Sequence, residues 1–290
     1  VSYRNFLIAS TLAFDHAFGQ HMINALIGYE QYRGLYNALY TNETDVGGSN
    51  YAYLPTSGTG FNIANGGYDP YPLVKSIFGR VNYDYKGKYL FSVSARRDAD
   101  FIKFGPGNQH GIFPAASAGW KISEEKFFKK YSNIVNQLKL RGSYGVVGNS
   151  QIPAYRFLSA YDVVSAQNFS PGGQPILNYT QTNLSNSSIK WESVYETNVG
   201  LDGELWNGKM YFSVDWYDKT TKDLLYKLPI PLSVGITDFY TNIGTVNNVG
   251  VDVSVGYRNN FNKLTYNLGA NASFNKNKVL DLDGINSNPI

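Results

Sequence analysis

The chain has 290 residues, a formal net charge of +3 and no cysteine, which excludes disulfide frameworks and thiolate-rich zinc or iron–sulfur sites. Its 25 lysines and arginines form no cluster, which argues against a nucleic-acid surface. No apolar run reaches about 18 residues, so transmembrane helices are excluded, whereas a membrane barrel made of alternating strands is not.

The first half of the chain predicts six strands. Apolar and polar side chains alternate in four of them, which is the period of a strand with one apolar face, whereas 6–14 is an apolar run with weak alternation and 112–122 is rich in small residues. The expected strands are 6–14, 21–32, 74–85, 89–97, 112–122 and 137–147. Between the last two, residues 123–131 predict one or two helical turns, with Ser123 as the N-cap and Lys129 and Lys130 near the end.

The second half predicts four more strands. A hairpin spans 197–218 around Trp206-Asn207-Gly208-Lys209, because Asn-Gly between alternating runs is a strong hairpin signal. Its second strand, which we expect to run to about Tyr226, places Met210, Phe212, Val214 and Trp216 opposite Tyr211, Ser213, Asp215 and Tyr217. Strands over 249–258 and 266–275 complete a set of about ten.

The connections between these strands alternate strictly in length. Those near 15–20, 86–88, 123–135, 205–209 and 259–263 are short or compact, and those near 33–73, 98–111, 148–190 and 227–240 are longer. All the long loops therefore leave the same end of the sheet. This arrangement is typical of an outer-membrane barrel, with short periplasmic turns and long extracellular loops.

Aromatic residues gather at all five short turns, as an aromatic girdle at a membrane–water interface predicts. A soluble β-sandwich or propeller is the main alternative, in which the apolar faces form a core and the strands are shorter. The long runs and the Gly, Ser, Asn, Asp and Arg content of the polar face favour a barrel with a hydrated lumen.

Ordered sequence motifs resemble the SusC/RagA group of TonB-linked outer-membrane transporters of Gram-negative bacteria. They include FPAASAGWKISEE at 113–125, LKLRGSYG at 138–145, NVGLD at 198–202, DWYDKT at 215–220 and NNVGVD at 247–252. The resemblance implies an all-β, antiparallel up-and-down transmembrane barrel of 22 strands, of which residues 1–290 would form a partial barrel domain. We expect the plug and the N-terminal domains to be absent from this chain and its C-terminus to be truncated.

The same resemblance implies function and partners. It implies active import of a nutrient across the outer membrane, usually an oligosaccharide and less often a peptide, with a SusD-like lipoprotein, TonB and membrane lipid as partners. A siderophore or cobalamin receptor of the same architecture is the alternative within transport, and a soluble β-rich surface adhesin is the alternative from another class.

No enzyme or cofactor site is expected. The sequence has no nucleophile–base pair, HExxH, GxSxG or phosphate-binding loop. His16 and His21 flank one turn, far in sequence from His110, and none of them has an acidic partner at ligand spacing, so no metal site is expected.

Two sets of residues are candidates for transport. The charged residues expected to face the lumen, where they would pair across strands or contact a plug, are Arg80, Asp84, Arg96, Lys139, Arg141, Asp202, Asp215 and Asp252. In or beside the second long loop, Tyr161, Tyr179 and Trp191 are candidates for stacking on a sugar ring.

Overall fold

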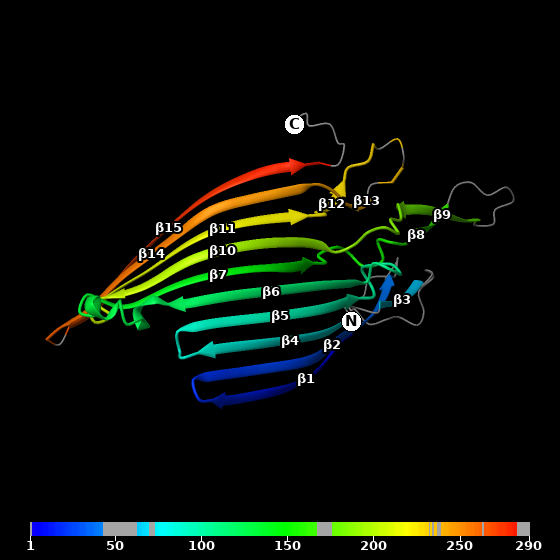
Figure 1. The fold of residues 1–290 in the computed structure, drawn as a ribbon. Helices are drawn as coiled ribbons and strands as arrows, with labels where there is room; N and C mark the ends of the chain where they lie inside the picture. Colours follow the sequence, from blue (N-terminus) through cyan, green and yellow to red (C-terminus); the bar gives the residue numbers. More distant parts are fainter. Residues whose placement is uncertain are drawn as a thin grey trace.

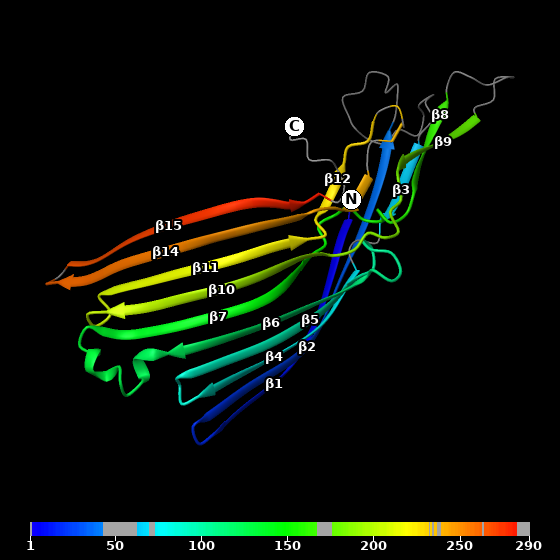
Figure 2. The same ribbon diagram turned by 45° about the horizontal axis from the view of Figure 1, so that its top comes forward.

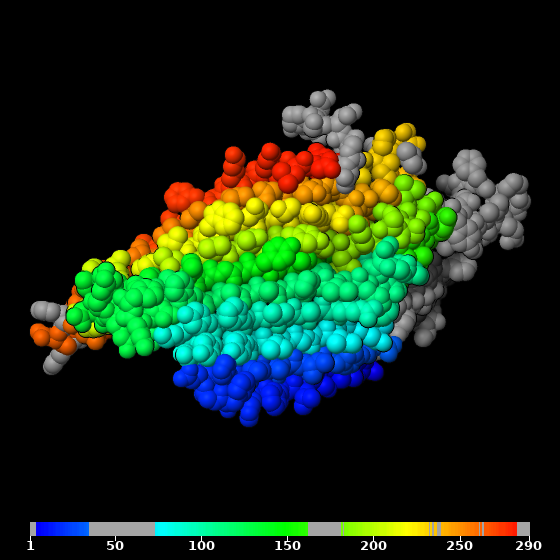
Figure 3. Space-filling model, viewed as in Figure 1, coloured from blue at the N-terminus to red at the C-terminus, as the bar shows by residue number. Residues whose placement is uncertain are grey.

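Ten long strands pair in chain order to form one antiparallel sheet. The computed structural model describes residues 2–42, 63–69, 73–166, 176–231, 233, 235–236, 239–262 and 264–282. The strands are β1 (Ser2–Phe18), β2 (His21–Asn42), β4 (Leu73–Tyr85), β5 (Tyr89–Asp100), β6 (His110–Lys121), β7 (Val135–Asn149), β10 (Glu192–Leu205), β11 (Met210–Lys222), β14 (Thr245–Phe261) and β15 (Leu264–Asp281). They lie side by side across the molecule (Figures 1 and 3).

Five shorter strands lie within the long connections. β3 (Ile63–Asp69) pairs with the end of β2. β8 (Ala160–Ala166) pairs with β9 (Ile176–Asn183), and β12 (Leu225–Leu228) pairs with β13 (Phe239–Asn242), so each pair forms a separate hairpin. These strands lie in segments predicted as loops, except that the start of β12 falls in the strand predicted to reach Tyr226. The alternation of short and long connections is confirmed, and all the long ones lie at one end (Figure 1).

The sheet has two chemically distinct faces. On what we call the apolar face, the register aligns Val81 with Val93, and Val214 with Val253. The alternate positions form the polar face, where Asn82 lies opposite Ser92. Large side chains on the apolar face have no protein covering, since Leu12 is 72% and Val93 60% exposed. A soluble sandwich would bury these side chains, so an uncovered apolar face favours a lipid environment.

The buried hydrophobic residues of the described chain gather at the long-loop end. Phe104, Ile152 and Ile189 form a small cluster there, and Trp191 and Leu225 pack against it. Nearby, the buried carboxylate of Glu192 accepts hydrogen bonds from Asn149 Nδ2 at 3.0 Å and from the backbone N–H of Leu225 at 2.9 Å. The long connections are therefore packed together rather than independent. In Figure 2 the short strands β3, β8, β9 and β12 lie at this end, beyond the ends of most of the long strands.

The short-turn end carries stacked aromatic rings. The ring of His21 lies 5.1 Å from Phe18 and 4.8 Å from Tyr85, and the ring of Tyr85 lies 6.2 Å from Tyr89. In the β10–β11 turn, Trp206, Asn207 and Gly208 all have positive φ, the region that Asn and Gly tolerate best. Among the described residues, no helix is long and apolar enough to cross a bilayer.

Two 3₁₀ turns, Ile122–Glu124 and Lys129–Tyr131, join β6 to β7. The prediction of Ser123 as N-cap is wrong, because the first turn starts at Ile122 and has no side-chain cap. Glu125 fixes the segment instead, since its carboxylate accepts hydrogen bonds from Tyr89 Oη at 2.7 Å, Lys88 Nζ at 3.2 Å and Trp120 Nε1 at 3.3 Å. These donors, Tyr89 first, lower the pKa of Glu125.

The prediction that the strand after Gly208 runs to Tyr226 is also wrong. β11 ends at Lys222, and Asp223 turns the chain with φ of +54°. Beyond this turn, Leu225 begins the β12–β13 hairpin. Residues 218–223 are all polar, so no alternation marks where the strand ends, and the prediction extended it through Asp223 to the apolar residues beyond.

Candidate functional site

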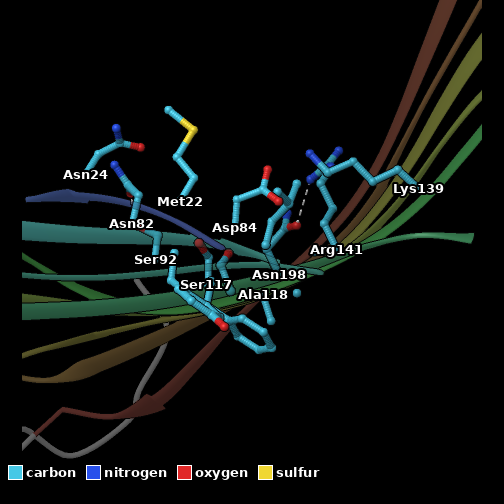
Figure 4. A pocket seen from close by; sticks show the side chains of 16 residues that line it. Met22, Asn24, Asn82, Asp84, Ser92, Ser117, Ala118, Lys139, Arg141 and Asn198 are labelled. Carbon is cyan, nitrogen blue, oxygen red and sulfur yellow. Dashed lines mark hydrogen bonds between the residues drawn. The ribbon is translucent and has the colours of Figure 1, made fainter. Parts of the chain in front are cut away.

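Neutral polar side chains form a row across six strands of the polar face. In register order the row consists of Asn24, Asn82, Ser92, Ser117, Ser143 and Asn198. Ser92 Oγ donates to Asn82 Oδ1 at 2.7 Å, and Asn24 Nδ2 donates to Asp15. Above the row lies an open cavity of about 390 Å³ (Figure 4). Its hydroxyl and amide groups can donate and accept hydrogen bonds without contributing net charge.

Charged residues border one side of this cavity. Asp84 Oδ1 accepts a hydrogen bond from the backbone N–H of Gly87 at 2.6 Å, so it also fixes the β4–β5 turn. Lys139 extends beside Gly119 into the cavity lining. Within the described chain, Lys139 makes no ion pair, whereas its neighbour Arg141 is fully engaged (Figure 4).

Arg141 joins three strands. From β7, its Nε and Nη2 donate to the two carboxylate oxygens of Asp202 on β10 at 3.0 and 3.2 Å. Its Nη1 and Nη2 reach Asp215 on β11 at 2.6 and 2.7 Å. Asn198 and Ser213 accept further hydrogen bonds from the same guanidinium at 3.2 and 3.3 Å. Paired N–H donors facing a carboxylate are the strongest geometry that an arginine forms.

Gly200 makes this reach possible. It lies on β10 directly between Arg141 and Asp215 in the register. A Cβ atom at Gly200 would lie 2.5 Å from Arg141 Cζ and 2.7 Å from Asp215 Oδ1, closer than atoms approach without something moving. The missing side chain therefore provides the space through which the guanidinium passes over β10. We call the set Arg141, Gly200, Asp202 and Asp215 the arginine clamp.

All eight charged residues predicted to face the lumen share the polar face of the sheet. Arg141, Asp202 and Asp215 meet in the arginine clamp. Arg96 pairs instead with Asp98 at 2.6 Å and Glu30 at 3.8 Å, and Asp252 accepts a hydrogen bond from Ser273. Arg80 lies away from these groups and makes no ion pair within the described residues. Their exposure to a lumen remains a prediction.

Sequence reasoning missed the neutral members of the site. Asn198 and Ser213 complete the coordination of Arg141, and Gly200 makes room for it. The signal was present, because all three occupy polar-face positions of the predicted hairpin. They were overlooked because the candidates were chosen by charge. Among the described residues, no cluster of three or more His, Asp or Glu forms a metal site.

The three aromatic residues predicted to contact sugars have different surroundings. Trp191 is packed, with its ring 5.1 Å from Phe104 and 5.4 Å from Phe113, and its Nε1 donates to the carbonyl of Gln109 at 3.0 Å. Tyr161 on β8 is 60% exposed. Tyr179 pairs with Val163 in the β8–β9 register, and its side chain lies outside the described part. Among the described side chains, no contact joins Trp191 to Tyr161, and a role in sugar binding stays a prediction for each of the three.

Comparison with known proteins identifies the family. The profile described as "TonB dependent receptor-like, beta-barrel" matches residues 2–290. The chain belongs to the TonB-dependent receptor family. The members it resembles are outer-membrane receptors and transporters rather than enzymes, so the predicted fold class, location and non-enzymatic character are confirmed. The apolar face of this TonB-dependent receptor segment is therefore its lipid-facing side.

Three relatives illustrate the match. TonB-dependent receptor P39 of Formosa agariphila is 35% identical over 91% of this chain and 25% of its own length. TonB-dependent receptor SusC of Bacteroides thetaiotaomicron is 33% identical over 72% of this chain and 21% of its own. The structure of the RagAB peptide transporter aligns with a TM-score of 0.83 at 24% identity, covering 97% of this chain and 31% of that one. The segment thus spans about a quarter of the curated relatives it matches.

Proposed function

We propose that this segment forms wall strands and surface loops of an importer for oligosaccharides or peptides. The observation that carries the proposal is the row of neutral amides and hydroxyls along the polar face, from Asn24 to Asn198. Such groups match the hydroxyls of a sugar or the amides of a peptide, because each of them can both donate and accept hydrogen bonds. The solved neighbour titled the RagAB peptide transporter supports the peptide class, and the resemblance of the sequence motifs to the SusC/RagA group implies the oligosaccharide class.

The larger protein would work by gated passage. Cargo would be held among the long loops, under a SusD-like surface lipoprotein, and a plug moved through TonB would open the lumen. The packed cluster around Phe104 and Ile189 supports this proposal, because it ties the β5–β6 and β7–β10 connections into one unit on which a partner can rest. Tyr161 on β8, in the β7–β10 connection, is exposed and remains our candidate aromatic residue for contact with cargo.

Uptake by the full-length receptor tests the proposal. A host lacking its own copy would be given labelled neutral oligosaccharides, short peptides or a ferric siderophore in separate assays. We expect saturable uptake of an oligosaccharide or a peptide, and uptake of the ferric siderophore alone would refute the assignment. Deleting part of 172–188 should abolish uptake while heat-modifiable migration on a gel still reports an inserted barrel. Unchanged uptake would reject that loop as the binding region.

A further inference from the structure

Four cations lie on the lipid-facing side of the sheet, close to its long-loop end. They are Arg4 on β1, Arg33 on β2, Lys75 on β4 and Arg97 on β5. The register sets Arg33 between Phe6 and Leu73, and Lys75 between Gln31 and Ala99. Each cation is therefore offset by two residues from the next, so that the four run diagonally across neighbouring strands. We call them the basic ladder.

The basic ladder lacks a counter-charge within the described chain. All four side chains are exposed and none forms an ion pair there. Lys75 lies over the ring of Phe101, with Nζ 5.6 Å from the ring centroid. The nearby acids Glu30 and Asp98 are on the opposite face, where both pair with Arg96. Like charges at such offsets repel each other, so the arrangement favours an anion supplied from outside the chain.

A cavity accompanies the charges. It has a volume of about 400 Å³, and its lining includes Arg33, Lys75, Leu73, Phe101 and Ile102. Two cations thus meet apolar and aromatic side chains in one recess. Towards the middle of the sheet, the same face exposes Phe6, Ile8 and Ile77, which are 53%, 57% and 53% accessible. From the long-loop end inward, the cations come first and the exposed apolar side chains follow. An anionic amphiphile has the matching order, a charged headgroup followed by hydrocarbon.

We propose that the basic ladder and its cavity bind the phosphate of an anionic lipid in the leaflet on the long-loop side. The phosphate would lie between Arg33 and Lys75, and the acyl chains would lie on Phe6, Ile8 and Ile77. Guanidinium groups bind phosphate oxygens through paired N–H donors, and an ammonium group adds a compact charge. Each such cation at an anionic membrane surface strengthens binding about fivefold.

The test uses the full-length receptor, purified in a zwitterionic detergent and titrated with diphosphoryl lipid A, phosphatidylglycerol or phosphatidylcholine. Native mass spectrometry measures the lipid that stays bound, and unfolding on heating measures the stabilisation. We expect an anionic lipid to bind and phosphatidylcholine not to bind. R33Q/K75Q should bind the anionic lipid about thirtyfold more weakly, and R97Q about fivefold more weakly.

R80Q is the matched control, since Arg80 lies on β4 with Lys75 but on the polar face and also makes no ion pair within the described residues. It removes one charge and should leave lipid binding unchanged. The proposal is overturned if R33Q/K75Q and R97Q bind the anionic lipid as tightly as the unmodified receptor does. It is also overturned if R80Q weakens lipid binding as much as R97Q does. Inorganic phosphate that competes as well as the lipid at equal concentration would also overturn it, by reducing the site to one for a free anion.

Discussion

Substitution of Gly200 by alanine tests the arginine clamp. The new methyl group would lie 2.5 Å from Arg141 Cζ and 2.7 Å from Asp215 Oδ1, so the guanidinium has to leave Asp215. The side chains of Arg141 and Asp215 are 31% and 20% exposed, so this ion pair is intermediate between a surface pair and a buried pair. A surface pair contributes about 0.2–1 kcal/mol, and disruption of a buried pair costs about 3–5 kcal/mol. We therefore expect Gly200→Ala to destabilise the protein by about 1–3 kcal/mol.

Gly142→Ala is the control for the effect of the substitution on the backbone. Gly142 lies one residue from Arg141 on the other face, and the nearest atom to a Cβ built there is the carbonyl oxygen of Asn198 at 3.9 Å. Replacing glycine by alanine at a compatible site stabilises by about 0.4–1 kcal/mol through the unfolded chain. Gly142→Ala should therefore be neutral or slightly stabilising, so that the two variants shift in opposite directions.

Urea unfolding of the full-length receptor, refolded into lipid vesicles, gives the free energies, and Arg141→Met completes the comparison. In an Arg141→Met background the clamp is already broken, so Gly200→Ala should cost nothing more. The coupling energy between the two sites then equals the cost of the single glycine substitution. If Gly200→Ala destabilises both backgrounds equally, or is as stable as Gly142→Ala, the clamp does not act as described.

Three further predictions concern other parts of the chain. Val253→Arg, on the lipid-facing side, should destabilise vesicle-refolded protein by about 2–4 kcal/mol and Ser254→Arg by much less, and the reverse order would contradict the assignment of faces. Hydrogen bonding lowers the pKa of Glu125, so the stability that this carboxylate contributes should be present above the usual carboxyl pKa and lost as pH falls through the lower folded-state pKa. Urea unfolding of Glu125→Gln at a series of pH values should lack this loss. A pH profile identical to that of the unmodified protein would refute the prediction. Trp191→Ala should hasten protease cleavage of the long connections at unchanged barrel stability, and unchanged cleavage would show that the indole does not hold them.

Much of the sheet was predictable because its strands and short turns are determined by residues close together in the sequence. Alternation sets the face of each side chain, and Asn207-Gly208 marks a turn that the structure places between Leu205 and Met210. The β8–β9 and β12–β13 hairpins escaped prediction because their short strands show no sustained period. The break at Asp223 depends on one backbone angle, and the uniformly polar residues 218–223 carry no period that would locate it.

The candidate site was predictable in face but not in pairing. The alternation of side chains between the two faces of a strand is enough to assign Arg141, Asp202 and Asp215 to the polar face. The guanidinium reaches these two carboxylates because of the register between β7, β10 and β11 and because Gly200 has no side chain. Neither feature can be predicted from the sequence of a single strand. Trp191 shows the opposite case, since its sequence position in a loop gave no sign that Phe104 and Phe113 surround it.

The neighbour-to-neighbour order of the strands also has a consequence for chain entropy. β7 and β10 are adjacent in the sheet although residues 150–191 separate them, about ten times as many as the four in the β10–β11 turn. Loop-closure cost grows only with the logarithm of length, so the longer connection costs about 2 kcal/mol more to close, and the β8–β9 hairpin shortens the free path further. A sheet built this way can exchange one surface loop for a longer one at little thermodynamic cost, which leaves recognition free to diversify above a fixed wall.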